Sequence, residues 1–228
     1  MGEGDIFSRR RRMLIDRLIA EGVLKERKVI EALLRVPREK FLPEGLAEQA
    51  YDDNPLPIGY GKTISAPHMV AIMNEALELE KGHKVLEVGA GSGYHAATIA
   101  EIVAPKGEES NGHVYTVEIV PQLVEQARAN LEETSYSPVV TVVLGDGSLG
   151  YPEKAPYDRI LVTAAAPQIP PALVEQLKPG GQLVIPVGGL HSFQSLVVAR
   201  KGLDGKLRLE DRGGVAFVPL LGKYGFQG

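Results

Sequence analysis

The stretch Val85-Leu86-Glu87-Val88-Gly89-Ala90-Gly91-Ser92-Gly93-Tyr94 decides the fold class of this 228-residue chain. Its first four residues are mostly apolar and predict a strand, the alternate glycines predict a tight turn, and the residues after Gly93 begin a helical pattern. Glycine lets a ligand approach the main chain closely, and the free amides at a helix start face that ligand. The stretch predicts a nucleotide-binding strand–turn–helix unit, and a tight turn without a ligand is the alternative.

Short apolar runs alternate with helical stretches on the C-terminal side of this turn. Strands are expected at 84–88, 114–118, 139–144, 159–163, 182–187 and 195–200. Helices are expected at about 93–103, 121–133 and 170–177. Strands that are apolar on both faces and alternate with helices indicate a parallel sheet covered by helices on both sides. We therefore expect an α/β fold with a doubly wound, mostly parallel sheet.

The N-terminal part has a different pattern. Residues 7–35 show helical spacing, and the side chains expected to face inward are Ile6, Met13, Leu14, Leu18, Val29, Ile30, Leu33 and Leu34. Pro37 ends the second helix. Residues 51–67 are rich in Pro, Gly and Asp, which predicts a long irregular segment of a kind that is often functional. A helix from His68 to Leu79 follows.

The C-terminal part predicts a hairpin over 201–211, turning around Asp204-Gly205, and a tail that includes 215–221. We expect one domain over residues 1–228. It divides into an N-terminal helical segment (1–80), a core (81–200) and a C-terminal extension (201–228).

The composition excludes several classes of protein. The chain has no cysteine, so disulfides, thiolate zinc sites and a cysteine nucleophile are excluded. Its five histidines and its carboxylates show no metal-ligand spacing, and we predict no metal. No window of about 20 apolar residues is present. A net charge of -4 gives no general attraction to nucleic acid or anionic membranes. We expect a soluble, cytoplasmic protein without membrane or nucleic-acid partners.

The glycine turn alone does not identify its nucleotide. Gly91-x-Gly93-x-x-Ala96 also satisfies the dinucleotide pattern, with Glu118 at an acceptable distance downstream. Against that interpretation, a carboxylate at Glu87 would repel phosphates and would suit a cationic ligand. The turn Gly145-Asp146-Gly147 follows the third apolar run, where its carboxylate could accept a hydrogen bond from an adenine amino group.

The stretch 84–187 resembles class I S-adenosylmethionine-dependent methyltransferases, motif by motif and in order, including the helix-to-strand junction Leu177–Leu183. The resemblance implies a Rossmann-like fold and S-adenosyl-L-methionine as the cofactor, with S-adenosyl-L-homocysteine as the product. It implies that the glycines line the methionine portion, that Glu118 binds both ribose hydroxyls and that Asp146 contacts adenine. The positions expected at the cofactor are Thr63, Ile64, Ser65, Glu87, Gly89, Ala90, Gly91, Ser92, Gly93, Glu118, Ile119, Asp146 and Gly147.

A second resemblance concerns the substrate. The segment Gly59-Tyr60-Gly61-Lys62-Thr63-Ile64-Ser65-Ala66-Pro67-His68-Met69 is similar to the signature of protein-L-isoaspartate (D-aspartate) O-methyltransferases. Ala164-Ala165-Ala166-Pro167 and Phe217-Val218-Pro219-Leu220 also match, and the resemblance extends from about residue 10 to 221. It implies methylation of the free α-carboxylate of L-isoaspartyl residues in damaged proteins. Separately from the resemblance, we expect a monomer.

This resemblance also implies site residues. Ser65 matches the active-site serine of the family, and the positions expected at the substrate are Thr63, Ser65, His68, Val218 and Leu220. Two alternatives stay open, because Ser65 could cap the following helix and His68 could pack locally. Other function classes are a cofactor-binding module without transfer activity and a methyltransferase for RNA or a small molecule. The acidic balance argues against RNA.

Overall fold

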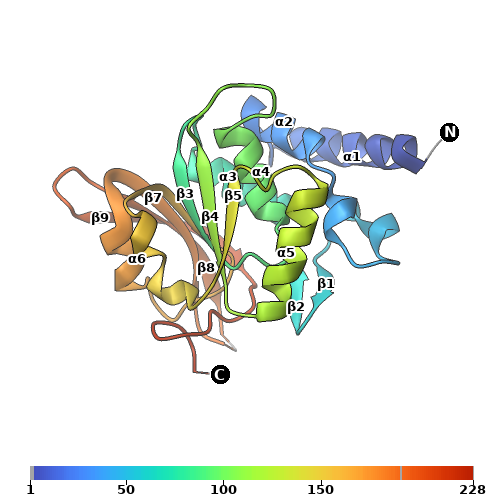
Figure 1. Cartoon of the computed structure of the whole chain (residues 1–228). Coiled ribbons are helices and arrows are strands. Elements are labelled where there is room, and N and C mark those ends of the chain that lie inside the picture. Colours follow the sequence, from blue (N-terminus) through green and yellow to red (C-terminus); the bar gives the residue numbers. More distant parts are fainter. Residues whose placement is uncertain (1–2, 191, 228) are drawn as a thin grey trace.

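A seven-stranded sheet with helices on both faces forms the body of the molecule (Figure 1). The computed structural model describes residues 3–190 and 192–227. The strand order is β5-β4-β3-β6-β7-β8-β9. The strands are β3 (Lys84–Val88), β4 (His113–Glu118), β5 (Val140–Leu144), β6 (Tyr157–Val162), β7 (Leu177–Gly188), β8 (Gln194–Lys201) and β9 (Leu207–Val215). Strands β3 to β7 are parallel, whereas β8 and β9 pair antiparallel. The predicted doubly wound, mostly parallel sheet is confirmed.

The helices lie in two layers. One face of the sheet carries α3 (Pro67–Leu77), α4 (Tyr94–Val103) and α5 (Pro121–Glu133), with α1 (Glu3–Ala20) and α2 (Arg27–Arg35) packed outside them, and the other face carries α6 (Pro171–Gln176). Four short 3₁₀ helices lie at Arg38–Phe41, Ala47–Gln49, Gly147–Leu149 and Pro152–Lys154 in the described residues. Successive residues of a strand point to opposite faces. Accordingly, Val85 belongs to the core under α1–α5, and Leu86 belongs to the core under α6.

Most expected elements of the core are present, with small differences at their ends. The strand expected at 182–187 begins earlier, at Leu177, because β7 follows α6 without a loop. The C-terminal hairpin is confirmed. It joins β8 to β9 through a turn in which the amide of Gly205 donates to the carbonyl of Gly202 at 2.9 Å.

The inward face of α1 differs from the prediction. Met13 is 63% exposed and Ile6 is 43% exposed, whereas Ile15 is buried beside Leu14 and Leu18. The reason is Arg11, which is itself buried and donates from Nη1 to the carbonyl of Leu34 at 2.8 Å. A charged side chain inside the buried stripe rotates the helix away from the face that hydrophobicity alone favours.

The segment expected to be irregular contains a β-hairpin. Strands β1 (Leu56–Gly59) and β2 (Lys62–Ile64) pair antiparallel. The two residues between them, Tyr60 and Gly61, both have positive φ (53° and 67°), as a type I′ turn requires. The hairpin buries Ile58 on the main core and brings the residues after Lys62 to the edge where the parallel strands end.

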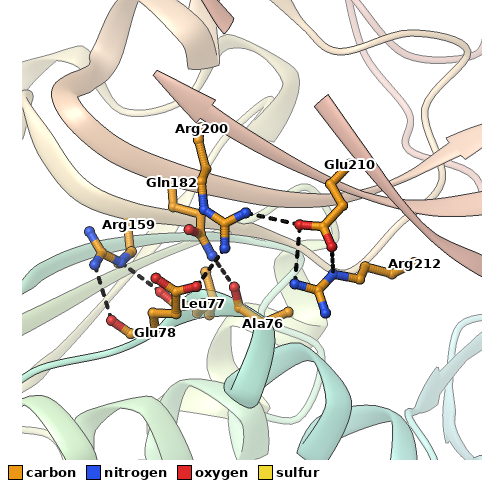
Figure 2. A network of polar contacts seen from close by, with 8 residues as sticks. All are labelled: Ala76, Leu77, Glu78, Arg159, Gln182, Arg200, Glu210 and Arg212. Carbon is orange, nitrogen blue, oxygen red and sulfur yellow. Dashed lines mark hydrogen bonds and ion pairs between the residues drawn. The ribbon is translucent and has the colours of Figure 1, made fainter. Parts of the chain in front are cut away.

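Side chains from three strands, β6, β7 and β8, hold the C-terminal end of α3 (Figure 2). The last carbonyl groups of a helix have no intrahelical partner, and cations near them are favourable. Arg159 donates from Nε to the carbonyl of Leu77 at 2.6 Å and from Nη2 to that of Glu78 at 3.1 Å, and Gln182 donates to the carbonyl of Ala76. A chain of ion pairs then runs from Glu78 through Arg200 and Glu210 to Arg212. The end of α3 is thereby fixed to the sheet.

Candidate active site

A cavity of about 550 Å³ lies at the carboxyl ends of β3, β4 and β6. Open α/β sheets bind ligands at the carboxyl ends of the strands, where the chain changes direction across the sheet. Here β4 and β5 lie on one side of β3, and β6 and β7 lie on its other side. We call this space the first cavity. Its lining residues are Lys62, Thr63, Val88, Gly89, Gly91, Val117, Glu118, Ile119, Gly147, Thr163, Ala164, Val218, Pro219, Leu220 and Leu221.

The glycine turn forms one wall of the first cavity. Gly89 has a φ of +99°, which side chains rarely permit, and a Cβ at this position would lie 2.3 Å from Oγ1 of Thr163. That hydroxyl donates to the carbonyls of Gly89 at 2.8 Å and Val88 at 3.1 Å. Only glycine therefore fits between the end of β3 and the loop after β6.

Glu118 fixes the other side of the turn. Its buried carboxylate accepts hydrogen bonds from three main-chain amides: Gly91 at 3.0 Å, Ile119 at 2.9 Å and Val120 at 3.0 Å. Each carboxylate oxygen has lone pairs to spare, so the group can also accept hydrogen bonds from hydroxyls of a ligand in the first cavity.

Glu87 does not reach any of the cavities. The side chain is completely buried and accepts a hydrogen bond from Oγ1 of Thr116, while its Oε1 has no partner in the described part of the chain. Burial, together with the nearby charge of Glu118, raises the pKa of Glu87 to about 8. The expectation that a charged Glu87 faces the cofactor is therefore corrected, because the side chain is mostly protonated at neutral pH and lies out of reach.

Asp146 is also engaged elsewhere. Its Oδ1 accepts from the amide and the hydroxyl of Ser148, at 2.9 and 2.6 Å, and its Oδ2 accepts from the amide of Lys223 at 2.8 Å. Asp146 lines none of the cavities, whereas Gly147 lines the first one. The predicted contact with adenine is thus not supported for the Asp146 carboxylate, which instead joins its turn to the C-terminal tail.

A second cavity of about 350 Å³ adjoins the first, since Thr63, Gly89, Gly91 and Thr163 line both. Its lining residues are Thr63, Ile64, Ser65, Val70, Gly89, Ala90, Gly91, Ser92, Tyr94, His95 and Thr163. Gly93 lines neither cavity, but its φ of +88° forms the end of the turn before α4. Burial lowers the pKa of His95 to about 3, so its ring is neutral, and Nε2 lies 3.2 Å from Oδ1 of Asn74.

A wide groove of about 1500 Å³ opens beside the second cavity. Its lining residues are Pro55, Thr63, Ser65, Ala66, His68, Met69, Thr163, Ser192, Phe193, Gln194, Gly214, Val215, Ala216, Phe217 and Val218. His68 is the only histidine and the only side chain that can carry a charge among these described lining residues. The groove brings together four of the five residues expected at the substrate, and Leu220 lies instead at the first cavity.

Several main-chain groups of the C-terminal tail, which follows β9, already have hydrogen-bond partners within the protein. Val218 accepts at its carbonyl from the amide of Ala165, and Leu220 donates its own amide to the carbonyl of Ala165, both at 2.8 Å. The carbonyl of Leu220 accepts from Phe226 at 2.7 Å. The amide of Leu220 is therefore not free for a peptide, whereas its carbonyl oxygen keeps a second lone pair, and its expected contact with the substrate stays a prediction. The amide of Val218 is without a partner in residues 3–190 and 192–227.

Ser65 lies at the border between the second cavity and the groove. The N-cap of α3 is Ala66, and no side chain of this residue can serve as a cap. The amide of His68 in the first turn is bound by Asp53 at 2.9 Å. The hydroxyl of Ser65 has no partner within the described residues, so the helix-cap alternative is wrong.

Thr163 is a site residue that the sequence did not indicate. It lines the first cavity, the second cavity and the groove, as Thr63 also does. Nothing local marks it, because it follows an ordinary buried strand. Its position depends on the pairing of β6 with β3, which brings it beside Gly89.

Comparisons with known proteins identify the family. The model of the family described as Protein-L-isoaspartate(D-aspartate) O-methyltransferase (PCMT) matches residues 9–225. The chain belongs to this family. A protein-L-isoaspartate O-methyltransferase of Hyperthermus butylicus is 57% identical over 223 residues, which are 97% of this chain and 92% of the relative. One from Methanopyrus kandleri is 56% identical over 228 residues, which are 100% and 98%.

Solved structures of protein-L-isoaspartate O-methyltransferases have the same fold. One is 32% identical with a TM-score of 0.84, covering 94% of this chain and 67% of that chain. A Plasmodium falciparum member, in complex with S-adenosyl-L-homocysteine, is 27% identical with a TM-score of 0.82, covering 92% and 98%. The chain is a protein-L-isoaspartate O-methyltransferase that uses S-adenosyl-L-methionine.

Two observations on the described residues concern other ligands and partners. No three His, Cys, Asp or Glu side chains among residues 3–190 and 192–227 gather in a way that could hold a metal ion. None of the helices described in this protein-L-isoaspartate O-methyltransferase is long and apolar enough to cross a bilayer.

Proposed function

We propose that the cofactor occupies the first and second cavities and that the isoaspartyl peptide occupies the groove. The observation that supports this arrangement is the shared border of the three spaces. Thr63 and Thr163 line all three, and Ser65 lines the second cavity and the groove. A methyl group delivered at this border would meet a carboxylate that enters from the groove.

The cofactor would span the glycine turn. Glu118 faces the first cavity and would accept hydrogen bonds from the two ribose hydroxyls, with Ile119 and Gly147 toward the adenine. Ala90 and Ser92 line the second cavity with Ile64 and would surround the methionine portion. Two of the expected residues act indirectly in this arrangement, because Asp146 shapes the turn at Gly147 and Gly93 shapes the start of α4.

S-adenosyl-L-methionine supplies the methyl group, and the ionised carboxylate of the substrate is itself the nucleophile, so no general base is needed. The chain's own residues have to align the two reactants. The hydroxyl of Ser65 would donate to the substrate carboxylate without bringing a competing charge. The free amide of Val218 would donate to the peptide main chain, and His68, which also lines the groove, would contact the peptide.

The partners we propose are damaged proteins and peptides that contain isoaspartyl residues, bound by a monomer in the cytoplasm without nucleic acid or membrane. The groove supports a peptide ligand, because apolar side chains such as Met69, Phe193 and Phe217 line most of it. The net charge of -4 gives a nucleic acid no general attraction.

The decisive experiment compares one peptide synthesised with either L-isoaspartate or L-aspartate at the same position. Radiolabelled S-adenosyl-L-methionine serves as methyl donor, and only the isoaspartyl form should gain appreciable label. Equal rates on both forms would refute the assignment of the groove to isoaspartyl peptides. Binding of S-adenosyl-L-homocysteine, measured by calorimetry with NAD as the control ligand, tests the cofactor cavities separately.

A further inference from the structure

Asp53 connects α1 and α3 through contacts with Arg17 and with His68, which lines the groove. Its Oδ1 accepts a hydrogen bond from the main-chain amide of His68 at 2.9 Å and lies 2.9 Å from Nδ1 of the same residue. Its Oδ2 pairs with Nη2 of Arg17 at 3.0 Å. Arg17 belongs to α1, and His68 belongs to the first turn of α3. One carboxylate thus holds the histidine ring, the helix start and an arginine from a distant part of the chain.

The contact with Asp53 determines the protonation pattern of the His68 ring. An ionised carboxylate only accepts hydrogen bonds, so Nδ1 of His68 carries a proton. In the neutral ring, Nε2 is then the acceptor, and it is the nitrogen that Asp53 leaves free. Because His68 lines the groove and its side chain is 40% exposed, the ring is held in a single tautomer at the surface proposed to bind the peptide.

Asp53 also replaces Ser65 at the start of α3. The first amides of a helix need acceptors from outside the helix, and negative charge is favourable there. Asp53 meets both requirements at the amide of His68, although it lies 15 residues away in the sequence. The other end of α3 is fixed by Arg159 and Gln182 (Figure 2). With both ends held, the hydroxyl of Ser65 is not needed to cap the helix.

We propose that Asp53 is a positioning residue for methyl transfer, acting through His68 and steadied by Arg17. It orients the ring of His68 toward the bound peptide and leaves the hydroxyl of Ser65 for the substrate carboxylate. This inference rests on the proposed function of the groove. Arg17 is half-exposed, and ion pairs of that kind contribute little to stability by themselves. The contact of Asp53 with His68 is therefore the one that matters for activity.

A double-mutant cycle tests the inference, with Asp53→Ala, His68→Phe and the variant that carries both changes. Each single change should raise KM for an isoaspartyl peptide about 10-fold, as expected for the loss of one hydrogen bond. Because Asp53 acts through His68, the double variant should be no worse than His68→Phe alone. The dissociation constant for S-adenosyl-L-homocysteine should stay within about twofold of that of the unchanged protein, since His68 lines the groove and neither cavity.

Two further variants separate positioning from folding. Asp53→Asn keeps the oxygen that accepts from both the amide and Nδ1 of His68 and loses only the pairing with Arg17, so it should keep the melting temperature and a nearly normal KM. Asp52→Ala is the matched control, because Asp52 is the exposed neighbour and lines neither cavity nor the groove. It should behave as the unchanged protein.

Several results would overturn the inference. If the increases in KM of the two single variants multiply in the double variant, Asp53 does not act through His68. A parallel loss of cofactor affinity and melting temperature in Asp53→Ala, or a KM in Asp53→Asn as high as in Asp53→Ala, would show that the contact of Oδ1 with His68 is not what supports activity. The unchanged protein's preference for isoaspartyl over aspartyl peptide tests the proposed function itself, so a failure of either idea is recognised separately.

Discussion

The hydroxyl of Thr163 donates a hydrogen bond to the carbonyl oxygen of Gly89 across 2.8 Å, and it thereby fastens the loop after β6 to the glycine turn after β3. The two residues are 74 positions apart in the sequence. Their contact lies at the common border of the first cavity, the second cavity and the groove. The shape of the methyl-transfer site therefore depends on this approach of two loops.

Gly89→Ala should weaken the binding of S-adenosyl-L-homocysteine by at least about 10-fold, because the new Cβ would lie 2.3 Å from Oγ1 of Thr163 at a φ of +99°. Calorimetric titration measures the affinity. Gly205→Ala is the control, since Gly205 also has a positive φ (+77°) but has no atom within 4 Å of the added Cβ. Equal affinities in the two variants would show that the clash between the new Cβ and Thr163 does not disturb the cofactor site.

Glu118→Ala should lower cofactor affinity by roughly 10- to 100-fold, because it removes the proposed hydrogen bonds to the ribose and frees the amide of Gly91. Glu125→Ala on α5 is the matched control, since its side chain is 74% exposed and pairs only with Arg128 among the described residues. An unchanged dissociation constant for the cofactor in Glu118→Ala would show that Glu118 only stabilises the glycine turn.

Ser65→Ala should reduce kcat by about 10-fold or more while the melting temperature stays nearly constant. The loss of a helix cap typically costs ~1 kcal/mol, but Ser65 is not the N-cap of α3. Turnover and thermal unfolding are measured on the same preparation. Loss of stability with normal turnover would contradict the proposed role of the hydroxyl.

Glu87 should make stability depend on pH. Its pKa of about 8 in the folded chain lies above the ordinary value of 4.5, so the folded state binds more protons than the unfolded state between these values. Its contribution to the free energy of unfolding is full below about pH 4.5 and is lost as the pH rises toward 8.

The corresponding variant is Glu87→Gln, which cannot titrate. Its stability relative to the unchanged protein should grow between pH 5 and 8, by at most about 1.4 kcal/mol per pH unit. Urea unfolding at three pH values measures the difference, and parallel profiles would contradict the assigned pKa. Affinity for S-adenosyl-L-homocysteine should change little, because Glu87 lines neither cavity.

The core could be predicted from the sequence because its signals are local. The glycines from 89 to 93 need a tight turn wherever they stand, and apolar runs such as 159–163 form buried strands in any parallel sheet. The hairpin β1–β2 was missed because its strands have only four and three residues and include Pro57 and Gly59, which are uncommon in strands.

The residues missed at the site are those whose position depends on distant contacts. Asp53 stands among other polar residues of an ordinary loop, and only the folded chain brings it to His68. Glu87 and Asp146 show the opposite error: their positions in the motifs predicted contact with the cofactor, but the folded chain directs them elsewhere. Their carboxylates are directed to Thr116 and to the tail instead, and no local pattern reports such partners.

The tail from Phe217 to Lys223 borders the groove at its start, the first cavity along its middle and the turn of Asp146 at its end. A single strip of chain therefore lines both the groove and the first cavity. We therefore expect the departure of the methylated peptide and the exchange of the spent cofactor to be coupled through this strip. Slowed amide hydrogen exchange at Lys223 would report the occupancy of the whole site from a residue that touches neither ligand.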